Sequence, residues 1–239
     1  EIFIEDPAVV QCLQEQNPKS ILDLMEFYCL DSGVRSLEGL QHFPNLSHGV
    51  FLNGVRGLEN LDLSKNTALE HFQLQENKLT SLKLPRTQSL KHISVEDTLL
   101  TSLDLSGYPQ LKTIDVSSNQ LTTLKLPKDA PIVELFAGEN KLQSFTVPNS
   151  YYLENLRLNK NPITQLKGSS TSLKNLYLSN TKLSGFDGAK FPNLKWLFFS
   201  GTPLKSIDIS GNLVLTYLDL GETDLISLEV RSNGMLEKL

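Results

Sequence analysis

One spacing of apolar residues recurs through most of this 239-residue chain. Apolar residues follow Leu69 at offsets 3, 5, 10, 13 and 15, and Asn77 stands at offset 8. The same unit starts again, 20 or 21 residues apart, at Leu90, Leu111, Ile132, Leu153, Leu173, Leu194 and Leu215. Neither a helix nor an ordinary strand has this period, so we predict short repeats stacked in one dimension.

Within each unit, the residues follow the leucine-rich repeat pattern L-x-x-L-x-L-x-x-N-x-L. We predict a leucine-rich repeat solenoid, a curved right-handed superhelix with a concave parallel β-sheet. The second half of each unit, as in Ser102-Leu-Asp-Leu-Ser106, alternates apolar and polar residues and is too short for a helix. The convex side should therefore be extended or turn-like.

The two ends of the chain depart from the period. Asp6-Pro7 resembles an N-cap with proline in the first helical position, so residues 7–16 should form a short helix. We predict an N-terminal helical cap at 1–23 and leucine-rich repeats at 24–239, ten full repeats plus the start of an eleventh at Leu236. We also expect the numbered chain to belong to a longer protein, against the alternative of a natural C-terminus.

The first two repeats are irregular. The first contains Leu24, Phe27, Cys29, Ser32, Val34 and Leu37 at the pattern positions. The second starts at Leu46 and is followed by a step of 23 residues. We place Gly49 and Phe51 at its inward strand positions and Gly54 at its Asn position, with two extra residues in the loop at 53–57.

The only two cysteines are Cys12 in the predicted cap and Cys29 in the first repeat. Both are expected to point inward, where a disulfide would tie the cap to the solenoid. Two buried free thiols are the alternative, because free cysteine often behaves as a small hydrophobe. Two cysteines are too few for a zinc site of the usual spacing.

One small polar residue per repeat should stabilise the turn after the strand. Buried backbone groups must be paired, and a side chain here can join its own repeat to the adjoining one. Asn carries both a donor and an acceptor, so it should do this more completely than Thr. The position reads Asn77, Thr98, Asn119, Asn140, Asn161, Thr181, Thr202 and Thr223.

Composition and motifs argue against several functions. The formal net charge of −5 disfavours nucleic acid as a partner. No run of about 18 apolar residues predicts membrane insertion. The chain starts with Glu rather than Met, so we expect it to begin after a removed or trimmed segment. Without a G-x-S-x-G, H-E-x-x-H or P-loop motif, we expect no enzyme, no cofactor and no metal.

Side chains at offsets 2 and 4 should point out of the sheet, because alternate residues of a strand face opposite sides. The first outward column reads Glu26, His48, His71, His92, Thr113, Glu134, Asn155, Asn175, Trp196 and Tyr217. The second reads Tyr28, Val50, Gln73, Ser94, Asp115, Phe136, Arg157, Tyr177, Phe198 and Asp219. These residues have no predicted role in the core, so their identity bears on function.

Aromatic residues gather in the last repeats of these columns. Exposed aromatic side chains with a polar rim are typical of recognition surfaces. We predict a ligand-binding patch bordered by Arg157 and Asp219. The alternative is that aromatic residues merely suit strands. The predicted patch comprises Phe136, Arg157, Tyr177, Trp196, Phe198, Tyr217 and Asp219.

Three of the four histidines, His48, His71 and His92, should form a second ladder. Adjacent imidazoles could bind a metal or respond to pH. Solvated histidines without a ligand are the simpler interpretation, because three in line do not give tetrahedral geometry.

The repeats resemble the internalin-like group of bacterial extracellular leucine-rich repeat proteins. Leu103-Asp-Leu-Ser-Gly107 and Ile207-Asp-Ile-Ser-Gly-Asn212 are similar to the tails of those repeats. Phe3-Ile-Glu-Asp-Pro7, Cys12, Cys29 and Ser36-Leu-Glu-Gly-Leu40 look like the capped start of such proteins. The resemblance implies a secreted or cell-surface protein whose concave face binds a protein ligand. A glycan is the alternative ligand that the sequence leaves open. We expect a monomer; a structural spacer of a longer surface protein is the alternative function.

Overall fold

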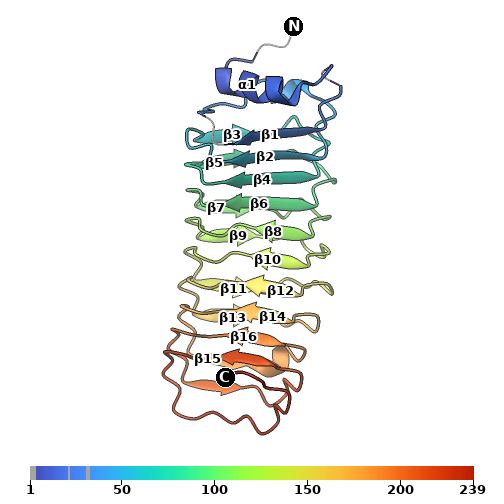
Figure 1. The fold of residues 1–239 in the computed structure, drawn as a ribbon. Coiled ribbons are helices and arrows are strands. Elements are labelled where there is room, and N and C mark those ends of the chain that lie inside the picture. Colours follow the sequence, from blue (N-terminus) through green and yellow to red (C-terminus); the bar gives the residue numbers. More distant parts are fainter. Residues whose placement is uncertain (1–3, 21, 31–32) are drawn as a thin grey trace.

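The computed structural model describes residues 4–20, 22–30 and 33–239. It is a solenoid in which successive turns stack from the N-terminal helix towards the C-terminus (Figure 1). A ten-stranded parallel sheet runs along one side, with one strand from each turn. The predicted fold class is confirmed, while Phe3 and Ser32 lie outside the described residues. The boundary between cap and repeats at residue 24 stays a prediction.

The strands of this main sheet are short and follow the chain without crossovers. Each places one or two apolar residues in the core, and these residues are 0–1% exposed along the whole sheet. The strands are β1 (Glu26–Leu30), β2 (Gly49–Asn53), β4 (His71–Gln75), β6 (His92–Glu96), β8 (Thr113–Asp115), β10 (Glu134–Phe136), β12 (Asn155–Arg157), β14 (Asn175–Tyr177), β16 (Trp196–Phe198) and β18 (Tyr217–Asp219). Lys238 then forms a parallel bridge with Tyr217.

The opposite side of the solenoid is extended or turn-like, as predicted. It contains four separate two-stranded parallel sheets and a 3₁₀ turn, η2 (Gly188–Lys190). A second 3₁₀ turn, η1 (Leu40–His42), lies in the first repeat. The paired strands are β3 (Asn60–Asp62) with β5 (Ser81–Lys83), β7 (Ser102–Asp104) with β9 (Thr123–Lys125), β11 (Ser144–Thr146) with β13 (Gln165–Lys167), and β15 (Gly185–Asp187) with β17 (Ser206–Asp208).

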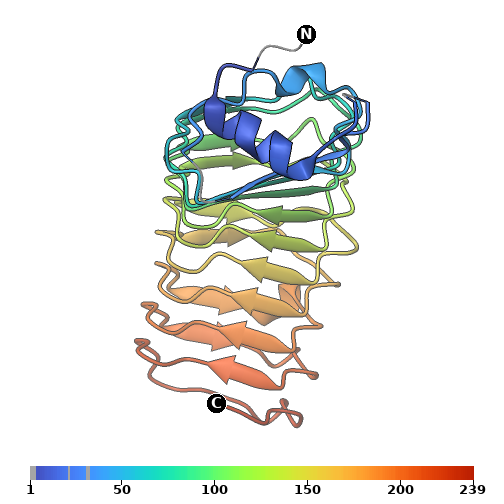
Figure 2. The ribbon, with the colours of Figure 1, turned by 45° about the horizontal axis from the view of Figure 1, so that its top comes forward.

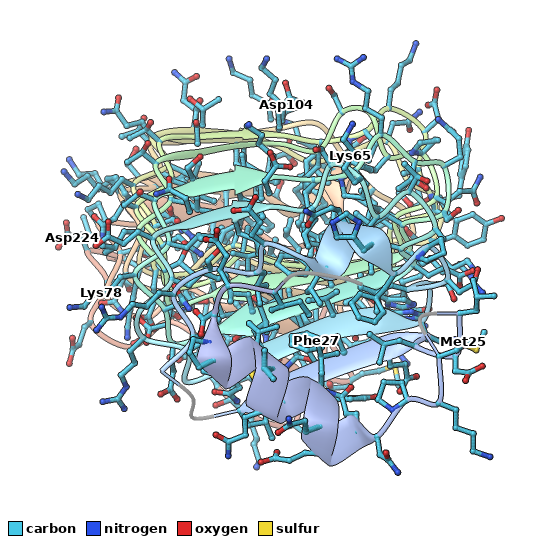
Figure 3. The ribbon with its side chains drawn as sticks, turned by 90° about the horizontal axis from the view of Figure 1, so that it is seen from above. Met25, Phe27, Lys65, Lys78, Asp104 and Asp224 are labelled. Carbon is cyan, nitrogen blue, oxygen red and sulfur yellow. A yellow bond between two sulfur atoms is a disulfide. The ribbon has the colours of Figure 1, made fainter. Side chains whose placement is uncertain are left out.

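A helix covers the first turn of the solenoid, at the place the sequence predicted. Helix α1 (Pro7–Gln16) begins after Asp6, whose Oδ1 accepts a hydrogen bond from the Ala8 N–H at 2.9 Å. It lies across the end of the coil (Figure 2) and buries Val9, Cys12 and Leu13. Figure 3 looks down the solenoid from this end, with Phe27 inside the coil beneath α1. The helix therefore covers apolar surface that the first repeat would otherwise expose.

A disulfide joins Cys12 of α1 to Cys29 of β1, with a Cα–Cα distance of 5.5 Å. The Gln16 side chain reinforces the junction, since its amide donates to the Tyr28 carbonyl and accepts from the Tyr28 N–H. The predicted disulfide is therefore confirmed, and the alternative of two free thiols is wrong.

The small polar residue of each turn behaves as its chemistry predicts. The Asn140 amide donates to the Val116 carbonyl of the preceding turn at 2.9 Å, and its Oδ1 accepts the Leu121 N–H, also at 2.9 Å. Thr181 makes one such bond, from its hydroxyl to the carbonyl of Leu178 in its own turn. Asn140 thus joins neighbouring turns, whereas Thr181 secures only its own turn; Thr98 differs from Thr181, because its hydroxyl donates to Oδ1 of Asn119 in the next turn.

The second repeat has a different register from the one we predicted. Val50 and Leu52 point into the core, and Phe51 points outward. Val50 pairs with Phe72 and Phe51 pairs with Gln73. One extra residue between Leu46 and the strand shifts every inward position by one, so the placement of Gly49 and Phe51 as inward and Val50 as outward was wrong.

The loop after β2 carries the second extra residue. Gly54 has a φ of 69° and occupies the left-handed position that Glu76, with a φ of 52°, takes in the next turn. Val55, not Gly54, occupies the Asn position and is fully buried. The two extra residues therefore lie on either side of β2 instead of together at 53–57.

Candidate functional site

The outward side chains of the main sheet form the surface that we call the sheet face. Each of the last five strands has three residues, and the middle one is a leucine with 0% exposure. Strand alternation therefore turns the first and third residues outward. All seven residues of the predicted patch occupy such positions. They lie on β10, β12, β14, β16 and β18.

Five of these side chains form one continuous stack, which we call the aromatic ladder: Phe136, Arg157, Tyr177, Phe198 and Tyr217. The Arg157 guanidinium carbon lies 4.7 Å from the Phe136 ring centroid and 4.9 Å from that of Tyr177. The Tyr177 and Phe198 rings stack at 4.5 Å, with 8° between their planes. Phe198 contacts Tyr217 at 4.9 Å in a tilted arrangement. Arg157 thus belongs to the stack, and the expectation that it borders the patch was wrong.

The ladder follows from the parallel register of the sheet. Phe136 pairs with Arg157, Arg157 with Tyr177, and Tyr177 with Phe198. Neighbouring strands lie about 4.8 Å apart, close to the preferred separation of stacked rings. Flat groups at one position of successive repeats therefore stack without distorting the backbone, and each side chain limits the motion of the next.

Trp196 and Asp219 complete the predicted patch outside the stack. Trp196 is 46% exposed and is paired in register with Tyr217 on one side and Asn175 on the other. Asp219 is paired in register with Phe198, and its Oδ1 accepts the Gly221 N–H at 3.0 Å. The patch thus combines one large exposed indole with a rigid stack and a carboxylate at its edge.

The middle of the sheet face is polar. The Glu96 carboxylate accepts hydrogen bonds from the Gln75 amide at 2.7 Å and the Ser94 hydroxyl at 2.8 Å. Asp115 is half-buried, and burial raises the pKa of its carboxyl group. The nearby charge of Glu96 adds to this rise in pKa, while hydrogen bonds from Ser117 and the charge of Arg157 oppose it. The centre of the face therefore holds carboxylates in a partly desolvated setting.

A second aromatic pair lies at the other end of the sheet face. Tyr28 and Phe51 stack with their centroids 4.8 Å apart and 8° between their planes. The sequence interpretation missed this pair because it assigned Phe51 to the core. The continuous apolar run from Val50 to Leu52 fits both registers, and only the pairing with Phe72 distinguishes them.

The predicted ladder of three histidines is wrong. His71 and His92 are paired in register and stack at 4.6 Å with 4° between their planes. His48 precedes β2, and Gly49 takes the outward position next to Glu26. Burial, and then the charge of His71, lowers the pKa of His92. The described residues contain no group of three His, Cys, Asp or Glu that could hold a metal ion.

Comparison with known proteins gives matches at the level of structure. Among the solved structures, 82 chains match. The internalin InlF from Listeria monocytogenes matches with a TM-score of 0.65 and 15% identity, over 98% of this chain and 82% of the other. YopM, a leucine-rich effector protein from Yersinia pestis, matches with a TM-score of 0.60 and 24% identity, over 78% and 57%.

The functional domain of InlJ from Listeria monocytogenes matches with a TM-score of 0.55 and 20% identity, covering 90% of this chain. This chain spans 58% of InlJ, as it spans 57% of YopM. No family model and no curated protein matches the sequence. The fold is thus an internalin-like leucine-rich repeat solenoid, while identities below 25% carry no function across. None of the described helices has the length and apolar character to cross a membrane.

Proposed function

We propose that this chain is an extracellular recognition module that binds a protein ligand through the sheet face. The observation that carries the proposal is the aromatic ladder with Trp196 beside it. These side chains lie on the outward side of strands whose buried leucines already supply the core. A folding role does not require five stacked groups and an exposed indole at these positions, so their presence favours a binding role.

The geometry favours binding in two ways. Trp, Tyr and Arg are the residues that most often dominate binding energy at interfaces. Immobilising a side chain on binding costs about 0.5–1.5 kcal/mol, and the stacked residues have already lost much of that freedom. A partner that contacts the ladder therefore meets a surface that needs little reordering.

The proposed location is outside the cytoplasm, secreted or on a cell surface. The Cys12–Cys29 disulfide supports it, because structural disulfides persist mainly in oxidising compartments. We propose a monomer that binds a protein, with a glycan as the alternative ligand. Enzymatic activity, a cofactor and nucleic-acid binding are not part of the proposal.

The proposal can be tested by immobilising the wild type and two matched variants and comparing the extracellular proteins that each one captures. Tyr177→Ala with Trp196→Ala and Phe198→Ala removes the centre of the patch. Tyr151→Ala with Tyr152→Ala removes two aromatic side chains that are 82% and 61% exposed and lie off the main sheet. We expect the first variant to lose its partner and the second to keep it, with unchanged circular dichroism for both.

A different outcome would contradict the proposal. Recovery of the same partner by the wild type and the patch variant would place binding elsewhere. If no partner depended on the sheet face, the role of structural spacer in a longer surface protein would be favoured.

A further inference from the structure

Charge on the sheet face is strongly unbalanced. Its three outward columns, at offsets 2, 4 and 6 of the repeats, hold two cationic side chains, Arg157 and Lys238, which pairs in register with Tyr217. The same columns hold five carboxylates, which belong to Glu26, Glu96, Asp115, Glu134 and Asp219. The aromatic side chains of this face are thus set in an acidic surface.

These five carboxylates form no ion pair with any residue that the structure describes. Among the described residues off the sheet face, five carboxylates pair with a lysine one turn away. On the opposite side, Lys125 lies 3.0 Å from Asp104, and at the strand starts Lys91 lies 2.6 Å from Glu70. The sheet face therefore carries more negative than positive charge, and no ion pair within the described part of the chain neutralises its carboxylates.

The uncompensated charge adjoins the aromatic ladder at one place. Phe136 is paired in register with Asp115 on one side and with Arg157 on the other. On the side of β12, the Arg157 guanidinium carbon lies 4.7 Å from the centroid of the Phe136 ring. The other side of the ring is bordered by Asp115, with Glu96 one strand further on. A second cation placed there would meet both a carboxylate and an aromatic ring.

We propose that the sheet face docks a protein that presents arginine or lysine side chains, one of which enters beside Asp115 against Phe136. The inference rests on the proposed function and adds the chemistry of the partner. Apolar groups of the partner contact the ladder and Trp196, while its cations meet Glu96, Asp115 and Glu134. Opposite charges on the two surfaces would also speed their encounter.

Two lysines near the edge of the sheet face favour an acidic partner instead. Lys112 and Lys195, at the starts of their strands, make no ion pair within the described chain and could meet an acidic partner. They lie outside the outward columns and away from the centre of the face, so we assign them to its rim. Exposed rim charges contribute little to affinity.

Selection from a display library of random 12-residue peptides on the immobilised 239-residue chain tests the proposal. We expect selected peptides to be enriched in Arg and Lys and to bind more weakly as salt is raised. Glu96→Gln with Asp115→Asn should weaken their binding at least tenfold. Glu38→Gln with Glu59→Gln removes two exposed carboxylates off the sheet face as the matched control.

The outcomes separate this inference from the proposed function. Peptides that need Tyr177, Trp196 and Phe198 but are not basic, or that bind equally to the Glu96 and Asp115 variant, would overturn the inference alone. Acidic peptides that need Lys112 and Lys195 would also overturn it. If no peptide depends on the sheet face, both proposals fail.

Discussion

Replacing Arg157 tests whether the aromatic ladder is a rigid, energetically coupled unit. An exposed cation–π contact contributes about 0.5–1 kcal/mol, and Arg157 makes two, at 4.7 and 4.9 Å. We therefore expect Arg157→Gln to lower the free energy of unfolding by about 1–2 kcal/mol. Gln keeps much of the aliphatic stem and removes the planar charge.

A double-mutant cycle isolates the contribution of each contact. Urea unfolding, followed by circular dichroism, is measured for Arg157→Gln, for Tyr177→Leu and for the combination. The coupling free energy should be about 0.5–1 kcal/mol, and the cycle with Phe136→Leu should give a similar value. The comparison requires equal m-values for all variants, because a changed slope signals a loss of two-state unfolding.

The matched control is Lys160→Gln, which removes a charge from the same turn. Lys160 lies 2.9 Å from Glu139 in an exposed ion pair, so its loss should change the free energy of unfolding by less than about 1 kcal/mol. Coupling energies near zero for Arg157 with both rings would refute the argument. The stack would then be loose, and the proposed binding surface would lack its preorganisation.

Three further changes test other parts of the structure. Asn140→Thr should lower the free energy of unfolding, measured by urea denaturation, by about 1–3 kcal/mol, because the buried N–H of Leu121 loses its acceptor. An unchanged free energy would contradict the role given to Asn. Reducing the Cys12–Cys29 disulfide should lower stability by about 3 kcal/mol for a separation of 17 residues, seen as a lower thermal midpoint. Burial and a neighbouring imidazole lower the pKa of His92, so its stabilising effect is complete above pH 6.5 and is lost as pH falls below that value. His92→Gln should flatten the stability profile between about pH 7 and 5.

Regular repeats could be read from the sequence because leucine spacing determines which residues face the core. From Leu69 onward, the inward and outward positions follow from offset alone, and the structure places Trp196, Phe198 and Tyr217 accordingly. The second repeat failed because Val50 and Phe51 are both apolar. One extra residue before the strand moved the register, and alternation could not reveal it.

Stacking within the site could not be read from spacing. A column of residues gives neighbours but not the orientation of their side chains. Arg157 could have extended into solvent at the border of the patch, where the sequence analysis placed it. Its position between two rings depends on rotamers that only the packed sheet defines. The charge imbalance of the sheet face was visible in the sequence, but its lack of compensating ion pairs was not.

The change from Asn to Thr along the solenoid has a consequence for the order in which the molecule opens. Asn119, Asn140 and Asn161 each bond across a turn boundary, whereas Thr181 and Thr202 do not. In a linear array, the free energy of unfolding is close to the sum of the stabilities of the repeats and of the interfaces between neighbouring repeats. Turns joined by weaker interfaces therefore open first, and their amide hydrogens exchange first. Asn212 still joins the turn of Trp196 and Phe198 to the preceding one, so on heating we expect the boundaries at Thr181 and Thr202, next to the sheet, to loosen before those of the earlier turns. Loss of recognition would then precede global unfolding.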